Sequence, residues 1–221
     1  MNSLATENYL KALFSLSRES GEVNVNDLAK YLNIKMPTVS SMMKKLSTKK
    51  LVHYERYKPL QLTEKGKKEA ALIIRKHRLT EMYLVKNMGF GWEQVHEIAE
   101  QIEHIKSPIF FSKMDELLNY PKFDPHGSPI PDKNGKMIRK EYNKLSDCKQ
   151  GDTVKVSAVI NTSDEFLNFL NSREIYLGLK MKINFIESFD GTMTVSYNNC
   201  SSEMLSQMVC NRLLVEMSCT T

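Results

Sequence analysis

The sequence predicts a mainly α-helical protein that ends in a small β domain. Three observations lead to this fold class. Apolar residues recur at helical spacing through most of the first 120 residues, two short strand-like runs interrupt them near residues 51–63, and short alternating runs take over from about residue 145. We therefore expect a helical domain with a small hairpin over residues 1–72, a helical middle domain over 73–142 and a β-barrel over 143–221.

Cysteine usage and hydropathy narrow the class of protein. The four cysteines all lie in the last third of the 221 residues, none forms a CxxC pair, and the N-terminus has no secretory leader pattern, so we expect no disulfide framework. No apolar run approaches the roughly 18 residues that span a bilayer. We therefore expect a cytoplasmic protein without a membrane partner.

Positive charge is concentrated at the N-terminal end. Residues 1–76 carry 15 Lys and Arg against 7 Asp and Glu, residues 77–142 carry 9 against 10, and residues 143–221 carry 7 against 9. A basic domain attached to neutral or acidic ones is typical of a nucleic-acid-binding module. The alternative is a lysine-rich surface without a specific partner.

The first residues predict three helices that include a helix-turn-helix. Residues 4–19 carry apolar positions at helical spacing and stop near Gly21. Asn26 is a candidate cap of a second helix that ends near residue 32, and Pro37 suits the first turn of a third, where its missing N–H costs nothing. Two helices joined by so short a connector have the order of a DNA-binding helix-turn-helix.

The third helix has a polar outer face that suits DNA. Its inner positions, among them Val39 and Met43, are apolar, whereas its outer positions carry small hydroxyl residues followed by lysines. Hydroxyls near the start of such a helix reach the major groove, and lysines bind phosphates. The candidate DNA-binding residues of this helix are Pro37, Thr38, Ser40, Ser41, Lys44 and Lys45.

A hairpin after this helix extends the motif to a winged helix. The segments LVHYE and LQLT read as two short strands around a basic turn. The turn carries Arg56, Tyr57 and Lys58 at its tip, where they are candidates for contact with backbone phosphate. The alternative is an ordinary surface hairpin beside an uncommitted three-helix domain.

Two further helices are expected in the middle domain. Thr63 can cap a long helix on which His77 and Glu81 are i, i+4 neighbours, and Ser107 with Pro108 forms a favoured start for a later one. The apolar residues of these helices exceed what a small helical hairpin buries. We therefore expect part of this surface to pair with a second copy of the chain.

The segment VHEIAEQIEHI lies between these helices and carries a polar stripe. His96, Glu100, Glu103 and His104 fall on one side of a helix, with no Lys or Arg among them. The stripe is either the solvated face of an amphipathic helix or one wall of a divalent-metal site, which needs imidazoles and ionised carboxylates without a competing cation.

Five ordered segments resemble those of the DtxR/MntR metalloregulators, a family named for the diphtheria toxin repressor and the manganese transport regulator. They are ATENYLKALFSL, PTVSSMMKKLSTKKLVHYERYKPLQLTEKG, RKHRLTEMYL, VHEIAEQIEHIKS and DPHGSPIP. The resemblance extends along the whole chain. It implies a winged-helix DNA-binding domain, a helical dimerisation domain and a C-terminal SH3-like domain, and it favours metal binding over the solvated-face interpretation.

The resemblance also implies two metal positions in each subunit, holding Mn(II) or Fe(II). The implied ligands are His77, Glu81 and His96 at one position and Asn8, Glu100, Glu103 and His104 at the other. Both sets combine imidazole with oxygen donors, as divalent transition metals require.

Three residues bear on which metal is bound. Glu100 stands where iron-responsive members have cysteine, and its harder oxygen favours Mn(II), with Fe(II) next. Asn8 stands where manganese-type members carry Asp and iron-type members Met, so its amide oxygen would bind without charge. Lys11 stands where a manganese-type member has a second carboxylate. The pattern therefore favours two separated sites over a compact pair of ions.

The last third predicts the small barrel. Its strands are VKVSAVI, MKINFIES, TMTVSYN and RLLVEM, with a capped helix at TSDEFLNFLNS. By resemblance this is an SH3-like domain, which in longer family members supplies ligands to the secondary metal site from the stretch that here contains Asp164 and Glu165. The alternative is that both are first-turn acids favoured by the helix dipole.

Together these features predict a metal-activated, homodimeric repressor that binds palindromic operator DNA and controls metal-uptake genes, with Mn(II) favoured over Fe(II). The alternatives are an iron-responsive regulator of the same family and a winged-helix regulator that senses an organic ligand and holds metal only structurally. An enzyme is not expected, because the chain has no HExxH motif, nucleophile elbow or phosphate-binding glycine loop, and we expect no small organic substrate.

Overall fold

The computed structural model describes residues 3–20, 22–138, 140–160, 162–198 and 200–218. The chain forms two compact units, which are described separately. The first comprises Met1–Thr80, Glu97–Lys122 and Ile130–Ile138, and the second Glu81–His96, Phe123–Pro129 and Arg139–Thr221. Among the described residues, no helix is both long and apolar enough to cross a membrane.

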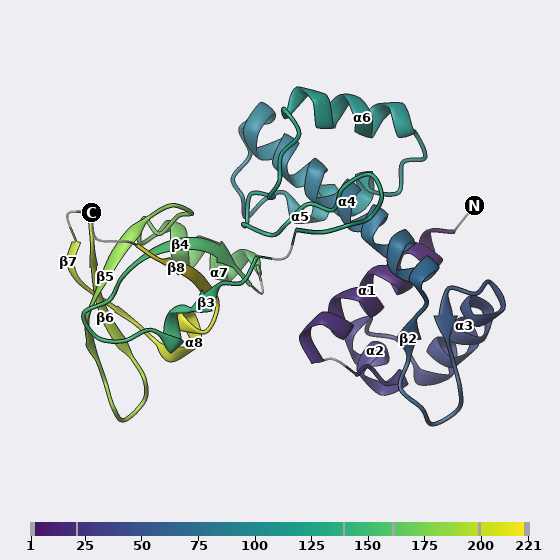
Figure 1. The fold of residues 1–221 in the computed structure, drawn as a ribbon, viewed down its shortest axis with the longest axis horizontal. Helices are drawn as coiled ribbons and strands as arrows, with labels where there is room; N and C mark the ends of the chain where they lie inside the picture. Colours follow the sequence, from purple (N-terminus) through teal and green to yellow (C-terminus); the bar gives the residue numbers. More distant parts are fainter. Residues whose placement is uncertain (1–2, 21, 139, 161, 199, 219–221) are drawn as a thin grey trace. The chain divides into compact units, whose positions relative to one another are not determined.

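The first unit begins with the expected winged helix-turn-helix (Figure 1). Its elements are α1 (Leu4–Ser20), α2 (Val25–Tyr31), α3 (Met36–Thr48), β1 (Val52–His53) and β2 (Gln61–Leu62). The strands are antiparallel, with Val52 opposite Leu62. The fully buried residues between these elements are Leu10, Leu13, Leu28, Met43 and Leu46. The outer face of α3 does not take part in this core.

The cap of α2 is Asn24, so the expectation that Asn26 caps this helix is wrong. The Asn24 side chain accepts a hydrogen bond from the backbone of Asp27, and the Asp27 side chain accepts one from the backbone of Asn24. This reciprocal capping box satisfies two backbone donors at the helix start. The helix therefore starts at Val25.

Three helices follow the wing: α4 (Glu64–Met88), α5 (His96–Ile102) and α6 (Pro108–Leu117). Thr63 and Ser107 cap α4 and α6 as expected, each accepting a backbone N–H three residues ahead. Helix α5 is shorter than the segment VHEIAEQIEHI suggests. Glu103 and His104 therefore lie in the turn after the helix, although the Glu103 N–H still bonds to the Ala99 carbonyl at 2.9 Å.

The second unit contains a sheet of six antiparallel strands in the order β3-β8-β4-β5-β6-β7, consistent with an SH3-like domain. The strands are β3 (Asn143–Lys144), β4 (Thr153–Val159), β5 (Lys180–Ile186), β6 (Met193–Tyr197), β7 (Cys200–Leu205) and β8 (Leu213–Met217), and the helices that accompany them are α7 (Asp164–Asn171), α8 (Gln207–Cys210) and a 3-10 turn (Leu145–Asp147). Figure 1 shows α7 and α8 beside these strands. Val154, Ile183, Val195, Leu205 and Leu213 are fully buried in its core.

Candidate metal centre

Glu103 is the centre of a buried cluster in the first unit. Its side chain has no exposed surface, and its Oε2 atom lies 2.6 Å from Nδ1 of His77 on α4. Lys76 donates to the Glu103 carbonyl at 3.0 Å, which fixes the turn after α5. Burial raises the pKa of Glu103, but the bonds from His77 and Lys11 outweigh it and hold the pKa below its ordinary value. The carboxylate is therefore ionised and suited to a cation.

Lys11 of α1 supplies a cation to this cluster. Its Nζ atom lies 2.8 Å and 3.0 Å from the two carboxylate oxygens of Glu103 and forms a further ion pair with Glu100. In the sequence, Lys11 stands out only because a manganese-type family member has a carboxylate at this position. Its place between two expected ligands depends on how α1 packs against α5, which spacing along the chain does not reveal.

Helix α1 brings Glu7 to the same cluster and also carries Asn8, the next residue. Glu7 Oε2 lies 2.7 Å from Nδ1 of His104, whose Nε2 lies 3.7 Å from Glu103. Asn8 Oδ1 is buried and lacks a hydrogen-bond partner in the described part of the chain. Such an orphan acceptor is costly, and a cation would stabilise it. Sequence reasoning missed Glu7, although its i, i+4 spacing from Lys11 on α1 was a signal.

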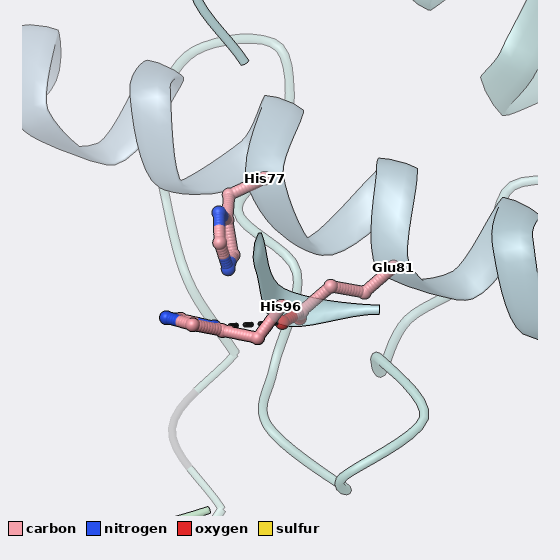
Figure 2. Close-up of side chains that lie close together, drawn as sticks. All are labelled: His77, Glu81 and His96. Atoms are coloured by element: carbon pink, nitrogen blue, oxygen red, sulfur yellow. Dashed lines mark hydrogen bonds and ion pairs between the residues drawn. The ribbon is translucent and has the colours of Figure 1, made fainter. Parts of the chain in front are cut away.

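A second group of donors surrounds Glu81. Figure 2 shows His77 and Glu81 on neighbouring turns of α4, with the His96 ring beside the Glu81 carboxylate. His96 Nδ1 lies 3.3 Å from Glu81 Oε1. The three residues each offer one ligand atom, and these atoms lie within 4.8 Å of one another. The structure thus brings together the three residues expected at one metal position.

The segment 123–129 adds two donors that sequence reasoning missed. Asp124 and His126 are buried and form with Glu81 another group of ligand atoms within 4.8 Å. His126 Nε2 lies 2.9 Å from the Trp92 carbonyl oxygen, which only accepts, so Nε2 donates. In a neutral ring Nδ1 then carries a lone pair, and it faces Glu81 Oε2 at 3.8 Å. Two acceptors that face each other in a buried site suit a shared cation.

A tight turn holds His126 in this orientation. Asp124 Oδ1 accepts the backbone N–H groups of His126 and Ser128, both at 2.9 Å. Gly127 has φ +85°, and a Cβ there would lie 2.3 Å from the Ser157 carbonyl oxygen of β4. Glycine is therefore required for the turn to approach the sheet this closely. The sequence showed this segment as DPHG, a turn signal, but not which helix it meets.

Asp164 and Glu165 lie in the first turn of α7 and are exposed. Ser163 caps this helix by accepting the Phe166 N–H. Within the described residues, neither acid belongs to a group of clustered ligand atoms. Their position suits the helix dipole, and their role as metal ligands stays a prediction.

The candidate DNA-binding residues form an open surface on α3 and the wing. On α3 all are exposed except Ser40, which is half-buried; the set is Pro37, Thr38, Ser40, Ser41, Lys44 and Lys45. At the wing tip Tyr57 is 97% exposed, and the Arg56 guanidinium lies 5.8 Å from the centre of its ring. Lys58 is exposed beside them. A basic helix face next to a basic hairpin tip matches a duplex and its phosphates.

Two family descriptions match the chain in order. The N-terminal DNA binding domain of iron-dependent repressors matches residues 1–60, and their metal binding and dimerisation domain matches residues 63–132. The chain belongs to the iron-dependent repressor family, also called the DtxR/MntR family.

Two relatives illustrate the similarity in sequence. The iron-dependent repressor IdeR of Mycobacterium tuberculosis is 36% identical over 133 residues, which are 59% of this chain and 58% of that protein. The chain thus spans little more than half of the mycobacterial relatives. The transcriptional regulator MntR of Bacillus subtilis is 31% identical over 120 residues, which are 54% of this chain and 84% of that protein.

Solved structures extend the likeness to almost the whole chain. A manganese-dependent transcriptional repressor in complex with manganese has a TM-score of 0.86 at 27% identity, covering 96% of this chain and 100% of that one. ScaR with bound Cd²⁺ has a TM-score of 0.81 at 29% identity, covering 96% of this chain and 99% of that one.

In this member of the family, the donors around Glu81 suit a divalent ion better than those around Glu103. Around Glu81 the imidazoles of His96 and His126 meet carboxylate oxygen, a donor set suited to divalent transition metals. At Glu103 the Lys11 ammonium already balances the charge. The two expected positions therefore differ in how readily they accept an ion.

Proposed function

We propose that the protein is a divalent-metal-activated transcriptional repressor and not an enzyme. The observation that carries the proposal is the set of imidazole and carboxylate donors gathered around Glu81 on the helix that follows a winged helix-turn-helix. A sensor needs both parts in one chain: a metal-binding site whose occupancy changes and a DNA-binding domain whose position responds. The names of the relatives, repressors that depend on iron or manganese, support the same function.

Manganese is the metal we favour, with iron second, at about two ions per subunit in line with the two donor groups. The grouped ligand atoms in the described residues are imidazole nitrogens and carboxylate oxygens, without thiolate. Cys148 and Cys210 are buried in the core of the β domain instead. Oxygen-rich sites suit Mn(II), whereas thiolate favours softer ions.

We propose that the acting form is a homodimer on operator DNA in the cytoplasm. Helix α6 exposes large apolar side chains, with Ile109 72% and Leu117 63% exposed, and such a surface suits a second copy of the chain. Two copies place two α3 helices on half-sites of a palindrome about one helical turn apart or a multiple of it. We assign residues 1–72 to DNA binding, 73–142 to dimerisation and metal binding, and 143–221 to the SH3-like domain.

In the mechanism, Glu81 with His96 and His126 would hold a divalent ion, which would supply positive charge against the repulsion among the carboxylates. His96 Nδ1 lies 3.3 Å from one oxygen of Glu81, and His126 Nδ1 lies 3.8 Å from the other. Glu7 and Lys11 join α1 to the turn after α5 through His104 and Glu103. A change at Glu7 or Glu103 is thus transmitted through α1 to the DNA-binding domain. Bound metal and bound DNA should strengthen each other, since coupling between two sites is reciprocal.

Replacing Glu81 by glutamine tests this function. Glu81→Gln keeps the side-chain shape and removes the charge, so we expect the affinity for promoter DNA at saturating Mn(II) to fall by at least about tenfold, with unchanged helical circular dichroism. Fluorescence anisotropy gives the affinity. Glu97→Gln, an exposed neighbour of His96 on α5, is the matched control and should keep the metal response.

The alternatives give different results. If metal is only structural and an organic ligand is sensed, Glu81→Gln should lose much of its helical signal together with DNA binding. A full metal response in Glu81→Gln would contradict the proposal.

A further inference from the structure

We propose that Lys11 is a built-in counter-cation of the Glu100–Glu103 carboxylate pair, so that a divalent ion binds this pair only by displacing the lysine ammonium. The inference deepens the proposed function and rests on it for its biological meaning. It concerns one residue of α1 and its effect on metal affinity at the Glu100–Glu103 pair.

The geometry places the ammonium where an ion would bind. Lys11 Nζ contacts both carboxylate oxygens of Glu103, at 2.8 Å and 3.0 Å, and also pairs with Glu100. An ion held by the same two carboxylates would need the same space, because metal–oxygen bonds are about 2.0–2.2 Å long. The ammonium and the ion therefore exclude each other.

The electrostatics make this competition strong. Glu103 has no exposed surface and the Lys11 side chain is 18% exposed, so their attraction is only weakly screened by solvent. A buried carboxylate needs a partner of opposite charge, and Lys11 provides it without metal. An incoming ion must first displace the Lys11 ammonium. Because α1 holds this ammonium near Glu103, its effective concentration there is high.

The donors around Glu81 differ from those around Glu103. Oε1 of Glu81 lies 3.3 Å from Nδ1 of His96, and Oε2 lies 3.8 Å from Nδ1 of His126. At Glu103 a lysine ammonium contacts both carboxylate oxygens. We infer that Lys11 lowers the metal affinity of the Glu100–Glu103 pair and leaves that of the Glu81 position unchanged.

The lysine also acts on the helix that carries it. The Lys11–Glu103 pair ties α1 to the turn after α5, as does Glu7 with His104 at 2.7 Å. Asn8 Oδ1, between them on α1, stays without a hydrogen-bond partner in the described residues.

The test is Mn(II) binding to the full chain without DNA. Equilibrium dialysis, with free Mn(II) counted by electron paramagnetic resonance, is compared for the wild type and Lys11→Met. We expect Lys11→Met to bind one of its ions at least about tenfold more tightly. Lys11→Arg keeps the charge and should retain the wild-type isotherm. Lys67→Met, which removes an exposed lysine paired with Glu64, is the control of equal charge change.

A second variant locates the gain. In the Lys11→Met background, Glu103→Gln should abolish the tighter binding, because it removes the carboxylate that Lys11 neutralises. Circular dichroism verifies that each variant is folded. Identical isotherms for the wild type and Lys11→Met would overturn the proposal, and so would an equal gain in Lys67→Met.

Failure of the proposed function would look different. DNA binding that ignores metal, combined with the expected shift in Lys11→Met, would refute the metal-activated repressor and leave the role of Lys11 intact.

Discussion

One oxygen of the Glu81 carboxylate faces His96 and the other faces His126. The two histidines come from different kinds of element. His96 was predictable because it opens a helix whose polar stripe is visible in the sequence. His126 was not, because it comes from a turn that reaches Glu81 only through tertiary packing. The same limit applies to Lys11. Spacing along one helix identifies residues that share a face, whereas contacts between elements depend on packing that no spacing encodes.

One residue in the β domain carries a pH prediction. Glu216 of β8 is bonded by Lys140 at 2.7 Å and by Ser157 at 2.8 Å, and these bonds lower its pKa from 4.5 to about 2. A carboxyl whose folded pKa is depressed stabilises the fold above its unfolded pKa and loses that contribution as the pH falls toward the folded value. The contribution should therefore be full above about pH 4.5 and vanish near pH 2.

The measurement is urea unfolding of the wild type and Glu216→Gln between pH 6 and pH 2. Unfolding is followed by circular dichroism. We expect the wild type to be more stable near neutral pH and the difference to shrink as the pH falls. Glu187→Gln, an exposed residue after β5, should show a much smaller difference. A difference for Glu216→Gln that is constant with pH would contradict this account.

At the scale of elements, local chemistry predicted the long helices and central strands. The caps Thr63 and Ser107 were found where the sequence placed them. Strand β7 was missed because CSSEML is mostly exposed and lacks regular alternation, as expected for a strand paired on one side. The two-residue strand β3 was missed because it is too short to show a period.

The cap of α2 shows how a local choice is decided. Asn24 and Asn26 are both good cap residues, but only Asn24 has an acid three residues ahead, Asp27, that completes a capping box. We expect Asn24→Ala to lower the free energy of unfolding by about 1 kcal/mol. Asn26→Ala lies inside the helix and should change it by a few tenths of that amount or less. Chemical denaturation checks both, and equal losses would contradict the assigned cap.

At the scale of the whole molecule, the sequence predicted the fold class and the order of its parts. The winged helix-turn-helix, the helical middle and a C-terminal β domain follow from patterns of apolar residues, although two of the six strands, β3 and β7, do not. The proposed function depends on coupling between the DNA-binding domain and the metal position, and coupling is a difference between two states. Local patterns do not contain that difference.

The measurement that tests the central claim most directly is the DNA affinity of the metal-stripped full chain as divalent metal is added. Fluorescence anisotropy on promoter DNA from its own genome is recorded anaerobically with Mn(II), Fe(II), Zn(II) and Mg(II) at fixed salt, because salt alone shifts such affinities. We predict tight binding with Mn(II), weaker activation by Fe(II) and little with Mg(II). Equal affinity with and without metal would contradict the account.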